Sequence, residues 1–201
     1  MKPVLFFYCS SHAKRLCSQA KLLTKITQQY TVQEFTKSGA TVMTLSFPNL
    51  QHLTNNDILL VQISGNSLFK RNIEFQNING KRIIHLKSFC PQDQATITQE
   101  TKLLKEHLRS LTCKIYVIDQ IYRHLYCCSK HFDNRIYRFQ KRQNTILSCQ
   151  FKDITNVRVI NHLKFLNRSK NWLTSYPNVI IVNANEIEKV QPKEVFKQIV
   201  A

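Results

Sequence analysis

Three short apolar runs constrain the fold of this chain more than any other feature of its sequence. They cover Val4–Cys9, Asp57–Ser64 and Lys114–Asp119. Each has the length of a β-strand, and a nearly continuous apolar run is typical of a strand that is buried on both faces. Strands of this kind occur in parallel sheets that carry helices on both sides, so the runs predict such a sheet.

The segments around these runs supply the other elements. Helical periodicity predicts helices at Ala13–Gln29, Thr41–Leu53, Asp93–Leu111, from Asp133 to about Ser148, and Lys193–Val200. The second is weak because Pro48 interrupts it. Further strands are predicted at Thr31–Lys37, Val157–Ile160 and Asn178–Val182. Residues 73–86 predict a hairpin with Asn79-Gly80 at its turn.

The alternation of strands and helices predicts a three-layer α/β/α, flavodoxin-like fold with a mainly parallel five-stranded sheet. The 201 residues suffice for one full core, and no internal repeat or linker-rich stretch divides them. We therefore expect residues 1–201 to form a single domain.

Residues suited to a catalytic site follow three of the predicted strands at their carboxyl ends. Ser11 follows the first, Gly39 the second and Asn66 the third. Because the carboxyl ends of parallel strands meet at one edge of a sheet, we expect these residues to lie close together. A serine nucleophile needs N–H donors aimed at the developing oxyanion, and a glycine amide and an asparagine side chain can supply them. The edge is therefore a candidate site for acyl hydrolysis.

The segments that carry these residues resemble the sequence blocks of the SGNH/GDSL hydrolase superfamily. SSHAKRL resembles the first block, KSGATV the second and VQISGNSL the third. The resemblance implies an SGNH-type fold and a serine ester hydrolase that needs no cofactor. It implies Ser11 as the nucleophile, with Gly39 and Asn66 at the oxyanion positions. Cys9-Ser10 stands where the family has Gly-Asp.

The family's last block, an Asp-x-x-His before the final helix, is missing. The corresponding region reads VNANEIEKVQPKEVF, and no histidine follows His162. Removing one member of a catalytic triad can lower turnover by about 10⁶. We therefore expect Ser11, Gly39 and Asn66 to be remnants of a site in a catalytically impaired domain. A displaced base would restore an active esterase, and three residues remain open for that role: His12, His124 and Glu188.

The charge of the chain points to a polyanionic partner. It has 29 lysines and arginines against 12 acidic residues, a net charge of +17. A surface this positive attracts RNA or another nucleic acid. Basic residues in loops and on the helix that starts near residue 133 are the predicted contacts: Lys70, Arg71, Arg123, Arg135, Arg138, Lys141 and Arg142. Degenerate blocks with a high basic count are similar in type to the non-catalytic, RNA-binding OSK domain of Oskar. A protein-interaction scaffold with an incidental charge is the further alternative.

The cysteines and histidines indicate neither a metal site nor a disulfide framework. The seven cysteines form no Cys-x-x-Cys pair and suit reduced thiols in the cytoplasm or nucleus. His124, Cys127, Cys128 and His131 lie close together, but no second pair has the spacing usual for zinc, so no metal is predicted. No apolar segment approaches the roughly 20 residues of a membrane span. The run after Lys2 is also short for the core of a signal peptide.

Overall fold

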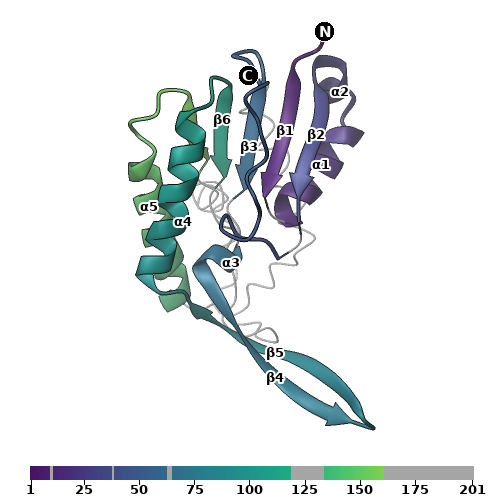
Figure 1. The fold of residues 1–201 in the computed structure, drawn as a ribbon, viewed down its shortest axis with the longest axis vertical. Coiled ribbons are helices and arrows are strands. Elements are labelled where there is room, and N and C mark those ends of the chain that lie inside the picture. The colour runs from purple at the N-terminus through teal and green to yellow at the C-terminus, as the bar shows by residue number, and fades with distance from the viewer. Residues whose placement is uncertain (10, 38, 63–64, 119–133, 161–201) are drawn as a thin grey trace, which may run out of the picture.

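A five-stranded parallel sheet forms the centre of the computed structural model (Figure 1). The structure describes residues 1–9, 11–37, 39–62, 65–118 and 134–160. The strand order is β2-β1-β3-β6-β7, and every neighbouring pair is parallel. The strands are β1 (Val4–Cys9), β2 (Thr31–Thr36), β3 (Ile58–Gln62), β6 (Lys114–Ile118) and β7 (Val157–Ile160). The three apolar runs are therefore neighbours in one sheet, and the predicted flavodoxin-like α/β fold is confirmed.

Helices cover both faces of the sheet. Successive side chains of β1 point to opposite faces, so each face of this strand presents apolar residues to a helix layer. Leu5 and Phe7 pack in a core with Leu16 of the first helix layer. Phe6 and Tyr8 pack in the other core, beneath the second helix layer. The first layer is α1 (Ser11–Leu22) with α2 (Thr24–Gln29), and the second is α4 (Gln94–Arg109) with α5 (Asn134–Gln150).

The predicted helix over Ala13–Gln29 is wrong in its middle. The backbone of Leu23 leaves the helical region, at φ −89° and ψ 106°, so α1 ends before it and α2 begins after it. Leu16 and Ile26 are buried as their spacing predicts, whereas Leu23 is 40% exposed. The break explains this difference, because it takes Leu23 off the buried helical face.

The predicted helix over Thr41–Leu53 is also wrong. Turns and irregular backbone cover this segment. The hydroxyl of Thr44 accepts the backbone N–H of Thr41 at 2.8 Å, and the hydroxyl of Thr41 accepts that of Thr44 at 3.2 Å. These side-chain bonds compete with helical ones, and Pro48 has no N–H to donate. The segment still covers the sheet, since Leu50 is buried in the same core as Tyr8.

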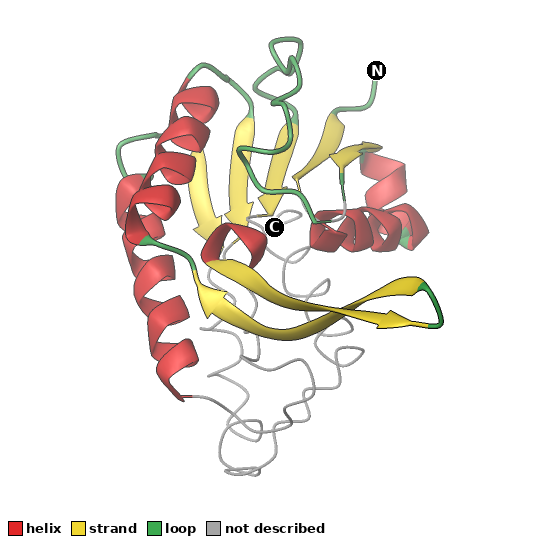
Figure 2. Cartoon of the chain, turned by 60° about the horizontal axis from the view of Figure 1, so that its bottom comes forward, coloured by secondary structure: helices red, strands yellow, loops and turns green. Residues whose placement is uncertain are grey.

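A long hairpin is inserted between β3 and α4. Its strands are β4 (Phe69–Ile78) and β5 (Lys81–Pro91), which follow the short helix α3 (Gly65–Leu68). Asn79 and Gly80 form its turn with φ values of 53° and 74°, as a two-residue type I′ turn requires. The predicted hairpin is confirmed and is longer than residues 73–86. Figures 1 and 2 show it reaching past the carboxyl edge of the sheet.

Several predicted elements lie outside the described residues. These are the first residue of the helix predicted from Asp133, the strand at Asn178–Val182 and the helix at Lys193–Val200. The predicted helix that begins at Asp93 is confirmed, because Asp93 is the N-cap of α4 and accepts the Thr96 N–H at 2.9 Å.

Candidate functional site

Ser11, Gly39 and Asn66 follow the carboxyl ends of three adjacent strands. The register pairs Cys9 at the end of β1 with Thr36 of β2 and Gln62 of β3, so the three strands end at one level. Ser11 is the first residue of α1, and Asn66 lies in α3. Gly39 lies in the turn after β2 at φ 78°, a left-handed conformation that suits glycine. The backbone therefore brings the three positions to the same edge.

The chain changes direction in the sheet between β1 and β3. From β1 it passes to β2 on one side, and it then returns to β3 on the other side. Ligands of doubly wound sheets bind in the crevice that such a switch creates beyond the carboxyl ends. Ser11 follows one strand of the switch and Asn66 the other. The predicted remnant site therefore lies beside the crevice beyond β1 and β3.

Two cysteines near the sheet are poor nucleophiles. Burial raises the pKa of the Cys17 thiol on α1, and the nearby Glu34 carboxylate adds to the effect. Burial raises the pKa of Cys113 to about 11. A thiol is reactive as the thiolate, so both residues have packing roles at neutral pH.

The predicted basic residues of α5 lie on its exposed side. Arg135, Arg138, Lys141 and Arg142 are all exposed. They recur at helical spacing, which places them on one face. The 17 residues of α5 include no acidic residue. No acidic side chain of α5 itself therefore offsets the charge of this basic face.

The other predicted basic residues have different settings. Lys70 and Arg71 lie in strand β4, and not in a loop as predicted, because the hairpin begins at Phe69. The ammonium group of Lys70 pairs with Asp93 at 3.2 Å. Two further basic residues, Lys81 and Arg82, lie in strand β5 of the same hairpin. Arg123 lies outside the described residues.

Phe139 stands among the basic residues of α5, where an aromatic ring could either stack on a base or pack in the core. Its ring meets that of Phe69 edge-on, with 5.6 Å between the centroids. It also packs against a small core cluster that contains Leu68 and Ile97. This contact joins α5 to the base of the hairpin, and it favours packing over base stacking for Phe139.

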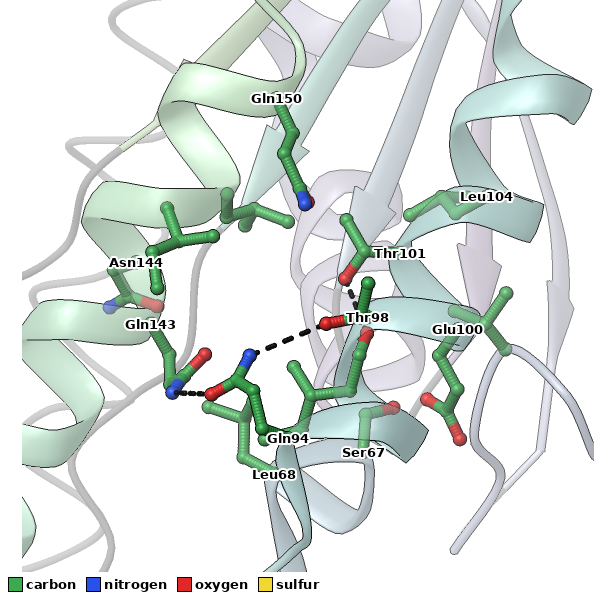
Figure 3. Close-up of a pocket in the computed structure, with 14 residues that line it drawn as sticks. Ser67, Leu68, Gln94, Thr98, Glu100, Thr101, Leu104, Gln143, Asn144 and Gln150 are labelled. Atoms are coloured by element: carbon green, nitrogen blue, oxygen red, sulfur yellow. Dashed lines mark hydrogen bonds between the residues drawn. The ribbon is translucent and has the colours of Figure 1, made fainter.

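A cavity between α3, α4 and α5 was missed by the sequence reasoning. Its lining includes buried polar side chains from all three helices, among them Ser67, Glu100 and Gln143 (Figure 3). A signal was present in the sequence, because Glu100 lies three residues after Ile97 and four before Leu104. A polar residue at that spacing shares the apolar face of its helix.

Two segments considered in the sequence analysis lie outside the residues that the structure describes. The histidine and cysteine cluster at 124–131 is one such segment, and the region of Asn185 and Glu188 is another. Within the described ranges, no group of three or more His, Cys, Asp or Glu side chains is arranged to hold a metal ion. No helix there is long and apolar enough to cross a membrane.

A search with protein-family models finds no match to this chain, and a search among curated proteins finds none either. The functional proposal therefore depends on the fold, on the residues at the carboxyl edge and on the basic face of α5.

Proposed function

We propose that this chain is a catalytically impaired SGNH-like domain that binds RNA through the basic face of α5. One observation carries the proposal: four exposed basic residues share a face of a helix that has no acidic residue. Lysine and arginine side chains on such a face can contact successive phosphates of a nucleic acid.

The acidic residue that follows α5 does not neutralise the basic face. Asp153 contacts Lys105 at 2.8 Å and also Arg109. Its charge is therefore directed at α4 and not at Arg138, Lys141 and Arg142. Within the described part of the chain, these three residues form no ion pair, so their charge is available to a polyanion.

The hairpin adds further positive charge, although Lys70 is paired with Asp93. Its two strands hold five basic residues and one acidic residue: Lys70, Arg71, Lys81, Arg82, Lys87 and Glu74. A two-stranded ribbon of this kind can follow a nucleic-acid backbone, and this supports a contact surface larger than α5 alone.

The fold supports the SGNH-like part of the proposal. The strand order and the positions of Ser11, Gly39 and Asn66 agree with what the sequence blocks imply. The free thiols of Cys17, Cys90, Cys113 and Cys149 support a reducing compartment, the cytoplasm or nucleus.

The experiment is an RNA titration with a matched pair of triple variants. Binding of a labelled single-stranded RNA is followed by fluorescence anisotropy at several salt concentrations. Arg138, Lys141 and Arg142 are changed together to alanine. The control changes Lys14, Lys25 and Lys37, three exposed lysines in and beyond the first helix layer, and removes the same charge. Weaker binding in the first variant alone supports the proposal.

An active esterase is the second candidate, favoured by the positions of Ser11 and Asn66 on either side of the switch between β1 and β3. It requires a base that the missing final block does not supply. A serine-dependent rate of ester hydrolysis would establish it.

A further inference from the structure

The cavity between α3, α4 and α5 has a volume of about 30 Å³. A cavity needs about 10–15 Å³ on this scale to hold one water-sized group, so it has room for roughly two. Its lining combines apolar residues such as Leu104 and Leu147 with several polar side chains. A guest of one or two non-hydrogen atoms therefore fits here.

Four oxygen atoms in the lining have no hydrogen-bond partner within the part of the chain that the structure describes. They are Ser67 Oγ, Glu100 Oε2, Gln143 Oε1 and Gln150 Oε1. Ser67 is 3% exposed and Glu100 is 5% exposed, so water outside the protein does not reach them freely. A buried acceptor left without a donor costs about 1–3 kcal/mol, and a charged one costs more. Four such atoms around one cavity call for a donor inside it.

The arrangement of the amide groups turns oxygen toward the cavity. Gln143 Nε2 donates to Gln94 Oε1 at 3.0 Å, which leaves Gln143 Oε1 as the free end of that amide. Gln94 Nε2 in turn lies 3.5 Å from the hydroxyl of Thr98. Figure 3 shows this chain of contacts crossing from α5 to α4. It takes up N–H groups of Gln143 and Gln94 and leaves the Gln143 oxygen as an acceptor, in a lining that also includes the Asn144 amide.

The most polar end of the cavity lies at Ser67 and Glu100. Figure 3 shows the Ser67 hydroxyl directed toward the Glu100 carboxylate. The two do not form a hydrogen bond. A group between them that donates to the carboxylate can also donate to the Ser67 hydroxyl, and a positive charge on it would offset the buried carboxylate.

We propose that this cavity binds the primary ammonium group of a small amine, with Glu100 as its counter-ion and Ser67 as a second acceptor. An ammonium group has three N–H donors and no acceptor, which matches a lining that is rich in acceptors. A calcium ion would take six to eight oxygen ligands, usually with several carboxylates, whereas Glu100 is the one carboxylate among the described residues of the lining. Transition metals prefer nitrogen or sulfur ligands, and the described lining has no histidine or cysteine.

The first test uses the wild-type protein. Methylammonium chloride is titrated at constant ionic strength, and backbone and side-chain amide signals are followed by ¹H–¹⁵N NMR. We expect saturable shifts confined to residues of α3, α4 and α5, including the Gln143 side chain. Tetramethylammonium has the same charge but no N–H and is larger, and it should give no saturable shift. A cavity that holds only ordered water gives none with either salt, and that result overturns the proposal.

The second test uses two variants and a matched control. Glu100→Gln keeps the shape of the side chain and removes its charge, and we expect it to weaken methylammonium binding at least about tenfold. Glu106→Gln removes a charge from the exposed side of the same helix and should bind as the wild type does. Ser67→Ala, which removes one acceptor, should weaken binding by several fold. Unchanged affinity in Glu100→Gln overturns the proposal, and if that variant does not fold, unchanged affinity in Ser67→Ala does so.

Discussion

The carboxylate of Asp57 accepts the backbone N–H of Val4 at 2.6 Å. It also accepts the backbone N–H of Thr54 at 2.7 Å and its hydroxyl at 2.8 Å. Asp57 immediately precedes β3, and Val4 is the first residue of β1. One buried side chain therefore sets where two central strands begin, at the edge of the sheet opposite the candidate site.

Asp57→Asn should lower the free energy of unfolding by about 2 kcal/mol, because charged acceptors make stronger hydrogen bonds than amides do. Burial alone would raise the pKa of Asp57, but the bonds from Val4 and Thr54 outweigh it and lower the pKa. Its stabilisation is therefore present above the pKa of the unfolded chain and is lost as the pH falls through the folded value. Urea unfolding at pH 7 measures the difference. Equal stability of the two proteins would contradict this role.

Acid should weaken the fold between about pH 4 and pH 2. The N–H and hydroxyl of Thr96, together with Lys70, lower the pKa of Asp93 to about 2. Lys105, with Arg109, lowers the pKa of Asp153 to about 2. The ordinary pKa of both is 3.8, so the unfolded chain takes up protons first as the pH falls, and stability is lost across this window.

The double variant Asp93→Asn with Asp153→Asn tests this origin. Asparagine is also a good N-cap, so the helix α4 should persist at pH 7. Urea midpoints measured from pH 5 to pH 2 should fall less steeply in the variant than in the wild type. Parallel curves for the two proteins would show that other groups cause the acid sensitivity.

The sheet could be predicted because each of its central strands is apolar on both faces, a pattern that is typical of buried parallel strands at this length. The hairpin could be predicted because Asn79 and Gly80 suit the positive φ values of its turn. The helix predicted over Thr41–Leu53 is wrong because the spacing of its leucines predicts only that they are buried. It does not predict the backbone conformation of the segment that carries them. There, threonine hydroxyls bond the backbone locally.

The candidate sites could be predicted only in part. The alternation of strands and helices along the chain predicts a parallel sheet. The strands of such a sheet end at one edge, so the common position of Ser11, Gly39 and Asn66 could be predicted. The cavity depends on how α4 and α5 face each other across residues far apart in sequence, such as Gln94 and Gln143. Spacing within one helix could mark Glu100 as unusual, but it could not identify the side chains opposite it.

Gly80→Ala should loosen the hairpin without unfolding the domain. Gly80 has φ 74°, where an alanine is strained by about 1–2 kcal/mol, although its added Cβ meets no atom within 4 Å. Amide exchange in β4 and β5 should therefore accelerate about 5- to 30-fold, while exchange in α4 is unchanged. Asn77→Ala, in the extended strand before the turn, is the control. Acceleration in α4 as well would mean that the hairpin is part of the global unfolding unit.

Ser11→Ala should leave ester hydrolysis unchanged. The predicted serine site has no general base in its expected block, so the serine hydroxyl is not activated. Hydrolysis of p-nitrophenyl acetate by the wild type and the variant should be equal. A wild-type rate that disappears in the variant would favour the esterase instead, and His12, His124 and Glu188 would then be tested as the displaced base.

RNA binding should depend strongly on salt. For a single strand, the slope of log affinity against log salt is about −0.7 for each neutralised phosphate, so about five contacts predict about −3.5. Replacing Arg138, Lys141 and Arg142 by alanine should make the slope shallower by about two units and weaken binding at low salt. The variant of Lys14, Lys25 and Lys37 loses the same charge from other elements, so it separates a local contact from general attraction. It should retain a slope close to that of the wild type.

Three outcomes of this titration have different meanings. A steep slope that only the α5 variant reduces supports the basic face as the binding surface. Equal reduction in both variants indicates attraction by net charge without a defined site. Weak binding with a flat salt dependence contradicts the nucleic-acid proposal, because contacts with phosphates release counterions and would give a steep slope. That outcome leaves the protein-interaction scaffold as the alternative.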